Sequence, residues 1–401
     1  MKKIVVMLFF ISIAFSSFGS STIYYEKVWD IDVDVGAKVI FDGTFLVNDS
    51  EQNVIYLGYD DGVEIRNDES QLTVHYEGIV PHNGFQIKAN ATIVTDYNNK
   101  LEYNPGFEVK PKQGTELTGY NSQMEDAVDS LVVESSIIET VVKFTEWVHK
   151  YIEYDLTYSE LENSLEIFEI KKGVCTAYSH LFIAMSNSVG LKTRFVSGFV
   201  LSKGWEPHAW VEVYIPGTGW LSADPTFNEV GTLDSTHVKV AYGAESNDIY
   251  EEIHSIGDAT VDFDSNARMT IVDFETKERD IEVEYGFNEK ERKIIVTLEN
   301  NEKFYKIIPY SFTVPESWGT IEKMHLVFEP YEKKEIEYPL NQELLAEGFE
   351  YNIPFKMMIY DHEYDDSIKI TVLKEKKEKN PLECLPVFII FSIMIMGFRN
   401  V

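Results

Sequence analysis

The sequence is short of cysteine and of positive charge. Its two cysteines, Cys175 and Cys384, lie in mid-chain and near the C-terminus, which argues against a disulfide between them. Lys and Arg number 35 against 67 Asp and Glu, so the formal net charge is −32. Phosphate binding needs a basic stripe, and this composition therefore excludes a nucleic acid as partner. We interpret the acidity as a solvated surface.

The sequence also lacks internal repeats, low-complexity domains and calcium-loop motifs. The acidic cluster at 361–366 does not have the Asp-x-Asp-x-Asp-Gly spacing of a calcium loop, so we predict neither a metal site nor a cofactor. A chain of 401 residues, 44% of them hydrophobic and 13% aromatic, can bury a large core. Its length suggests two to four domains.

The N-terminus is typical of a signal peptide. Met1-Lys2-Lys3 is a basic start, IVVMLFFISIAF is an apolar stretch of suitable length, and Ser17 and Gly19 suit the −3 and −1 positions of a cleavage site. We therefore predict a signal peptide over residues 1–20, and hence export.

The C-terminus ends in a second apolar run. The run LPVFIIFSIMIMGF follows the charged residues KEKKEKN, so we predict a spacer at 374–380 and a membrane anchor at 381–401. Fourteen residues at about 1.5 Å each span about 21 Å, which is shorter than a hydrocarbon core of about 30 Å. A core helix of the last domain is the alternative. The anchor predicts a cell-surface protein with its domains outside.

Both flanks of the chain read as strands. Alternating apolar residues and Asn, Asp and Gly turns predict an N-terminal β-sandwich over 21–122 and a C-terminal one over 254–373. Between them, over 123–253, the pattern changes. The stretch 135–154 has apolar residues every three or four positions, which predicts an amphipathic helix, and 159–170 is also helical.

A third helix is expected to begin at Cys175 and to stop at Gly190, followed by strands at 191–202, 208–216 and 220–225. A helix start favours thiolate over thiol. A nucleophilic thiolate needs a base and an orienting acceptor, for which His208 and Asp224 are candidates. A hairpin at 216–219 would leave Asp224 short of the position opposite His208. Taken singly, these residues are more often a buried cysteine, a hydrogen-bonded histidine and a turn aspartate.

Taken together with their neighbours in the sequence, these three residues match the motif pattern of a known family. The segments GVCTAYSHLFIAMSNSVGLKTRFVSGFV and HAWVEVYIPGTGWLSADPT resemble the core of the transglutaminase-like superfamily. That family has a Gly-x-Cys at a helix start, then His-Ala-Trp-x-Glu-Val and Gly-Trp-x-x-x-Asp-Pro-Thr in this order. The segment THVKVAYGAESNDI at 236–249 resembles the stretch that closes this core. The likeness covers about a third of the chain, roughly residues 130–250.

The resemblance implies a fold and a chemistry. The fold is α+β and papain-like: a helix carrying the cysteine packs on a small antiparallel sheet that carries His208 and Asp224. Cys175 would be the nucleophile, His208 the acid and base, and Asp224 the orienting acid of a thioester mechanism. The oxyanion would be bound by the Cys175 backbone N–H and one further donor, for which Trp147 and Tyr154 are the candidates.

Two classes of function follow. The first is a cell-surface thiol enzyme that attacks a carbonyl of a protein or peptide substrate, with hydrolysis favoured over transfer to an amine. The second is a non-catalytic module that binds peptide or scaffolds the two β-domains. A complete set of Cys175, His208 and Asp224 favours the enzyme, because an inactive site has no need of its cysteine.

Overall fold

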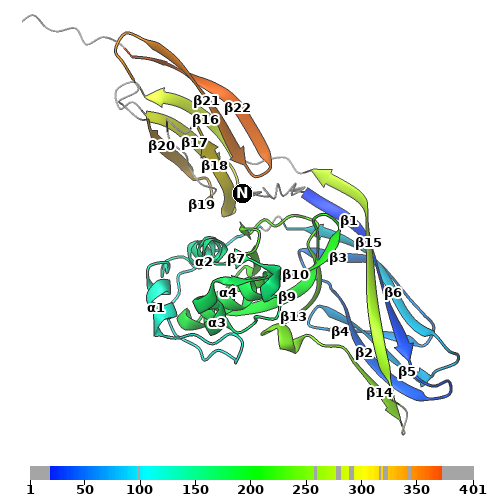
Figure 1. The fold of residues 1–401 in the computed structure, drawn as a ribbon. Coiled ribbons are helices and arrows are strands. Elements are labelled where there is room, and N and C mark those ends of the chain that lie inside the picture. Colours follow the sequence, from blue (N-terminus) through cyan, green and yellow to red (C-terminus); the bar gives the residue numbers. More distant parts are fainter. Residues whose placement is uncertain are drawn as a thin grey trace, which may run out of the picture.

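A small set of helices and many antiparallel strands make up the protein in the computed structural model (Figure 1). The structure describes residues 19–97, 100–256, 260–276, 281–288, 293–315, 318, 324–340 and 345–372. The predicted spacer and C-terminal segment at 374–401 and most of the predicted signal peptide lie outside these ranges. Residues 19 and 20, which we assigned to the signal peptide, begin strand β1 (Gly19–Asp32).

The described residues contain four α-helices, all in the middle of the chain. The expected helix over 135–154 is α2, and its Ser136 side chain accepts a hydrogen bond from the backbone N–H of Glu139 as an N-cap. The helix starting at Cys175 ends where Gly190 takes a left-handed conformation with φ of 83°. The helices are α1 (Ser122–Asp129), α2 (Ile137–Tyr151), α3 (Ser164–Ile170) and α4 (Cys175–Val189), with a 3₁₀ turn η1 (Leu156–Tyr158).

The sheet beside these helices has five antiparallel strands in the order β12-β11-β10-β9-β13. Its strands are β9 (Thr193–Leu201), β10 (Trp205–Ile215), β11 (Gly219–Asp224), β12 (Glu229–Val230) and β13 (Val238–Gly243). Helix α4 packs on β10 and β9, and twelve of its fifteen residues are buried. The α+β expectation of a cysteine helix against an antiparallel sheet is confirmed. A short parallel pair, β7 (Glu153–Tyr154) and β8 (Lys172–Gly173), lies next to the start of α4.

Two further sheets, in the orders β15-β1-β6-β3 and β14-β2-β5-β4, combine strands that precede the core in the chain with one strand each that follows it. Their inward residues form one hydrophobic cluster that also takes in Val238, Val240 and Ala241 of β13. The remaining strands are β2 (Lys38–Val47), β3 (Gln52–Tyr59), β4 (Val63–Asp68), β5 (Gln71–Ile79), β6 (Phe85–Asp96), β14 (Glu252–Ile256) and β15 (Asp262–Thr276).

Strands β14 and β15 correct our placement of residues 254–276 in the C-terminal domain. Strand β15 pairs with β1 along their whole lengths, and β14 pairs with β2. The chain therefore returns to the N-terminal sheets after completing the core. Alternation in a strand predicts which side chains face inward, but it does not say which strand will be the neighbour.

The last strands form two sheets, β16-β17-β20 and β19-β18-β21-β22, which share a hydrophobic cluster of their own. They are β16 (Ile281–Asn288), β17 (Lys293–Asn300), β18 (Lys306–Thr313), β19 (Met324–Phe328), β20 (Lys333–Pro339), β21 (Glu350–Ile359) and β22 (His362–Thr371). Strand β19 meets helix α2, where Glu146 accepts hydrogen bonds from the backbone N–H and ring Nδ1 of His325.

The prediction of a membrane-anchored cell-surface protein is corrected. Among the residues that the structure describes, no helix combines the length and the apolar character needed to cross a membrane. The segment 381–401, on which that prediction was based, lies outside the described ranges. Fourteen apolar residues already fell short of the thickness of a hydrocarbon core.

Candidate active site

Cys175 is the first residue of helix α4 and is partly buried. The preceding residue, Val174, has an extended conformation and supplies no side-chain cap to the first turn. The Ala177 N–H donates to the Val174 backbone oxygen, while the positive end of the helix dipole favours an anion at the cysteine. Further along the helix, the Tyr178 hydroxyl donates to the backbone oxygen of Ile152, which ties α4 to the end of α2.

Gly173 sets the distance between strand β8 and the start of α4. A Cβ added at this buried glycine would lie 2.3 Å from the Cβ of Ala177, in the first turn of the helix. The close neighbour of Gly173 is therefore the helix that carries Cys175.

His208 and Asp224 meet across the hairpin of β10 and β11. The last register pair is Val211 with Ala223, so Asp224 follows opposite Trp210 and two residues away from His208. Residues two apart on one strand share a face, and such diagonal neighbours are within reach of side chains. His208 Nε2 lies 2.7 Å from Asp224 Oδ2, and both side chains are buried. Asp224 is offset by two residues from the position opposite His208, and the two side chains meet through this diagonal contact.

Asp224 is held by four hydrogen bonds. Its Oδ1 accepts from the backbone N–H groups of Thr226 and Phe227 at 2.7 and 3.2 Å. Its Oδ2 accepts from Nε2 of both His208 and His237, the second at 3.2 Å. Burial raises the pKa of Asp224, but the charges and hydrogen bonds of the two histidines lower it by more, and the net shift is downward. Asp224 is therefore a fixed, buried carboxylate.

Cys175 and His208 are electrostatically paired. Burial raises the pKa of the Cys175 thiol, but the hydrogen bond with His208, the charge of that ring and the Ala209 backbone N–H lower it below its usual range. Burial likewise lowers the pKa of His208, whereas the Asp224 charge and hydrogen bond and the contact with Cys175 raise it to about 10. With Nε2 bonded to Asp224, the other ring nitrogen, Nδ1, is left for the thiol. Both shifts favour the thiolate form of Cys175 and the imidazolium form of His208.

Aromatic rings fix the plane of the His208 imidazole. Phe227 stacks on it with ring centroids 4.8 Å apart and an interplanar angle of 13°, and Trp210 stacks at 5.9 Å and 24°. Phe227 is 40% exposed, so it also presents apolar surface to solvent beside the histidine. The ring of His208 can therefore exchange protons with little freedom to rotate.

The two oxyanion candidates occupy different places. Trp147 stacks on Tyr151 at 4.2 Å and on Phe168 at 6.3 Å, as part of the helical packing. Tyr154 belongs to β7, which pairs with Gly173 two residues before Cys175. Burial raises the pKa of Tyr154, and the negative charge of Cys175 raises it further. Of the two, Tyr154 is the one with an electrostatic contact to the cysteine.

His237 lies in the closing segment 236–249 and was not among the residues predicted to form the site. His208, Asp224 and His237 are buried, and their ligand-type atoms all lie within 4.8 Å of one another, the only such trio among the described residues. Both Nε2 atoms already bond to Asp224 Oδ2, so hydrogen bonding accounts for the proximity. The signal that could have identified His237 is its position one residue before a buried strand in the closing segment of the core.

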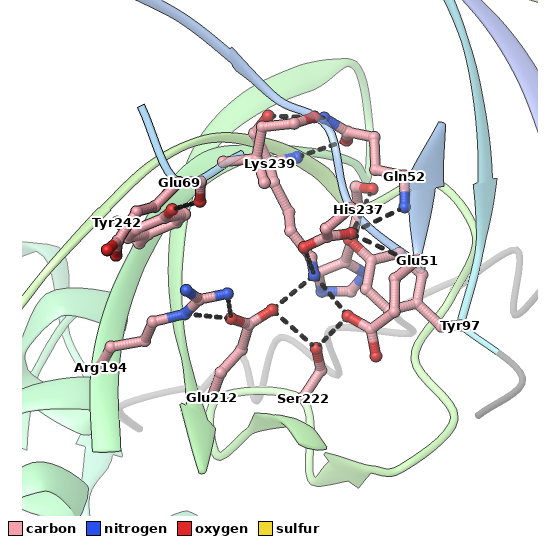
Figure 2. A network of polar contacts seen from close by, with 12 residues as sticks. Glu51, Gln52, Glu69, Tyr97, Arg194, Glu212, Ser222, His237, Lys239 and Tyr242 are labelled. Atoms are coloured by element: carbon pink, nitrogen blue, oxygen red, sulfur yellow. Dashed lines mark hydrogen bonds and ion pairs between the residues drawn. The ribbon is translucent and has the colours of Figure 1, made fainter. Parts of the chain in front are cut away.

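A buried ionic network lies next to this site and joins it to the N-terminal sheets (Figure 2). Lys239 of β13 forms ion pairs with Asp49, Glu51 and Glu212, and Arg194 binds the other oxygen of Glu212. Burial lowers the pKa of Lys239, but the three carboxylates raise it well above its usual value. Strand β13 is thus attached to β10 and to the β2–β3 turn by charges that are almost completely removed from water.

Comparison with known proteins gives a family match for the middle of the chain. Residues 127–225 match the family model described as the transglutaminase-like superfamily, and this range contains Cys175, His208 and Asp224. An uncharacterized protein of Mycobacterium leprae is 23% identical over 196 residues, which cover 46% of this chain and 68% of that protein. A protein-glutamine gamma-glutamyltransferase of Pseudomonas aeruginosa is 31% identical over 72 residues. That match covers 15% of this chain and 11% of the Pseudomonas protein, so the chain spans about a tenth of that relative's length.

Solved structures show a weaker likeness. A Cytophaga hutchinsonii protein assigned provisionally as a cysteine protease has a TM-score of 0.42 at 15% identity, over 64% of this chain and 93% of that one. Red sea bream transglutaminase has a TM-score of 0.23 at 9% identity, over 88% and 78% of the two chains. At these scores the likeness adds nothing on activity. The family match and the motifs agree on the middle of the chain, where residues 127–225 match the family model of the transglutaminase-like superfamily.

Proposed function

We propose that this protein is a thiol enzyme of the transglutaminase-like superfamily that attacks a peptide or carboxamide carbonyl, with Cys175, His208 and Asp224 as its catalytic triad. The observation that carries the proposal is the orientation of His208. Its Nε2 is bonded to a buried carboxylate, while its other side meets a thiol at a helix start. This is the arrangement that an activated nucleophile and its base require.

The chemistry proceeds in two halves. The Cys175 thiolate attacks the carbonyl carbon, a C–S bond forms, and the carbonyl electron pair moves onto oxygen. The tetrahedral intermediate collapses, the C–N bond breaks, and the leaving amine takes the proton from His208. The product of this half is a thioester on Cys175 with a neutral His208.

The second half restores the enzyme. An acceptor enters, His208 removes its proton, and the acceptor attacks the thioester so that the C–S bond breaks and the thiolate is released. We propose water as the acceptor, giving an acid, and keep a primary amine as the alternative. Throughout, Asp224 holds His208 in one orientation and stabilises the charged ring.

The developing oxyanion needs donors that are in place beforehand. We propose that these donors are the backbone N–H of Cys175 and the hydroxyl of Tyr154. Tyr154 lies on the strand beside Gly173, and the charge of the cysteine raises the pKa of its hydroxyl. Trp147, the other candidate, is engaged in the stack with Tyr151 and Phe168. We also propose that the paired sheets on either side of the core are β-sandwiches, since each pair shares one hydrophobic cluster.

The decisive experiment is incubation with a pool of glutamine-containing peptides and a labelled primary amine, followed by mass spectrometry. Peptide-bond cleavage or conversion of an amide to an acid supports hydrolysis, and incorporation of the amine supports transfer. Each product should disappear in Cys175→Ala while the circular dichroism spectrum stays unchanged. Absence of all products in the wild-type protein, or products that persist in Cys175→Ala, would refute the proposed thiol chemistry.

A further inference from the structure

We infer that His237 is a positioning residue of this site: a buried imidazolium that clamps Asp224 and balances its charge, so that His208 is oriented toward Cys175. The inference rests on the proposed triad and adds a fourth member that acts through Asp224. His237 precedes β13 directly and is completely buried.

The charge of His237 follows from its partners. Nε2 lies 3.2 Å from Asp224 Oδ2, and Nδ1 lies 2.9 Å from the backbone oxygen of Asp234. A backbone oxygen only accepts, and so does an ionised carboxylate. A neutral imidazole has one N–H and would face one of these acceptors with a lone pair. Both contacts are satisfied only when both ring nitrogens carry a proton.

Asp224 must be ionised for this reasoning to hold, and its hydrogen bonds require that. Two backbone N–H groups point at its Oδ1, and two imidazole nitrogens point at its Oδ2. A carboxylate that accepts several hydrogen bonds keeps its negative charge. One anion therefore lies between two rings, and a thiolate lies beyond one of them. With His208 and His237 both protonated, the charges of these four groups sum to zero.

The other groups around His237 are consistent with a cation. His208 faces it from β10 with ring centroids 5.7 Å apart and disfavours its charge. Glu229 of β12 is partly buried and accepts a hydrogen bond from the Asp234 backbone N–H, and burial raises its pKa to about 7, so it is ionised at pH 8. Burial of His237 lowers its pKa, but the hydrogen bond and charge of Asp224 and the charge of Glu229 raise it by more. The carboxylates on two neighbouring strands thus outweigh the repulsion from His208.

The backbone of His237 is fixed from the N-terminal side. The Tyr97 hydroxyl donates to the His237 backbone oxygen at 3.1 Å, and the Lys239 network follows two residues later (Figure 2). Gly198 allows β13 to approach β9 closely, since a Cβ there would meet the Val238 oxygen at 2.0 Å. The ring therefore cannot follow Asp224 if Asp224 moves, and this rigidity is what a positioning residue needs.

A second buried histidine provides a matched control. His180 Nδ1 lies 2.8 Å from the Glu162 backbone oxygen, but its Nε2 accepts from the backbone N–H of Ser246 at 3.2 Å. With one acceptor and one donor as partners, His180 is satisfied as a neutral ring. The two histidines are equally buried in the same domain, yet their hydrogen-bond partners make His180 neutral and His237 positively charged.

The first test is ¹⁵N NMR of the full chain with labelled histidine, in which the two signals are assigned by their loss in His237→Gln and His180→Gln. At pH 8 we expect two protonated ring nitrogens in His237 and one in His180. A neutral, singly protonated His237 would overturn the inference, whatever the activity of the protein.

The second test measures the cysteine without turnover. In a Cys384→Ser background, the rate of iodoacetamide alkylation of Cys175 is followed from pH 4 to 9. We expect His237→Gln to raise the midpoint of this profile by about one pH unit, because a nearby cation that favours the thiolate is lost. His180→Gln should leave it in place. A His237→Gln profile that superimposes on the wild type, in a folded protein, would overturn the inference.

These experiments distinguish failure of the proposed thiol enzyme from failure of the positioning role of His237. If wild-type Cys175 alkylates like an ordinary thiol with a midpoint near pH 8.5, the proposed thiol enzyme fails and the NMR result on His237 still stands. If the wild type is activated and His237→Gln is unchanged, only the role of His237 fails. Where a substrate is identified, we expect His237→Gln to lower kcat by roughly 10- to 100-fold with little change in KM, as for other groups that orient a catalytic side chain.

Discussion

Substitution of Lys239 by methionine tests how strongly the buried network stabilises the fold. The Lys239 side chain is 1% exposed, and its partners Glu51 and Glu212 are 2% and 0% exposed. Breaking a buried ion pair by removing one partner costs about 3–5 kcal/mol, because the other charge is left without compensation. Glu212 keeps Arg194 as a partner, so we expect the loss to come mainly from Glu51 and to be about 3 kcal/mol.

The pH dependence of the variant's stability should also be stronger than that of the wild type, and its sign follows from Glu51. Burial already raises the pKa of Glu51, and Lys239 is the largest influence that lowers it. Without Lys239, the folded state will bind a proton at Glu51 that the unfolded state releases above its ordinary pKa of about 4.3. Stability therefore falls as pH rises above that value, by at most about 1.4 kcal/mol per pH unit.

The assay is urea denaturation of the full chain followed by tryptophan fluorescence, at pH 5 and pH 7. Lys239→Met should be less stable than the wild type at both pH values, and the difference in stability should be larger at pH 7. Adding Glu51→Gln should recover much of the loss and remove the part of the pH dependence that comes from Glu51. Lys38→Met is the matched control, since Lys38 pairs with Glu77 at the surface and should hardly matter. A Lys239→Met protein as stable as the control would refute the reasoning.

Three further predictions concern the active site. Gly173→Ala should destabilise the protein by about 1–3 kcal/mol and slow Cys175 alkylation, since the new Cβ meets Ala177. Gly204→Ala is the control, because a Cβ at Gly204 would have nothing within 4 Å. Equal unfolding midpoints for these two variants would contradict the prediction. Asp224→Asn should lower kcat by roughly two to four orders of magnitude with the fold intact, measured on the peptide found above; a loss below tenfold would contradict the orienting role. The pKa of His208, raised to about 10, predicts a contribution to folding stability that is complete below about pH 6.5 and is lost as pH rises to about 10. Denaturation from pH 6 to 10 checks this, and His208→Gln should flatten that decline; identical pH dependences in the two proteins would contradict it.

Much of the site could be predicted from local sequence. The helix start at Cys175 and the stop at Gly190 follow from apolar spacing and from the left-handed conformation that glycine tolerates. The tight turn at 216–219 follows from its proline and two glycines. The shared face of His208 and Trp210 follows from the two-residue period of a strand. These features depend on neighbours a few residues away, so the sequence carries them directly.

Other features depended on contacts between distant segments. Only the structure shows that β15 pairs with β1, that Gly173 faces Ala177, and that Lys239 is buried with three carboxylates. A lysine among alternating residues reads as exposed, because burial of a charge requires partners that the pattern does not reveal. The sequence by itself determined which residues form the nucleophile, base and acid we propose. The tertiary structure alone decided their diagonal contact and placed His237 behind Asp224, since hydrogen bonds between strands depend on register, which periodicity does not specify.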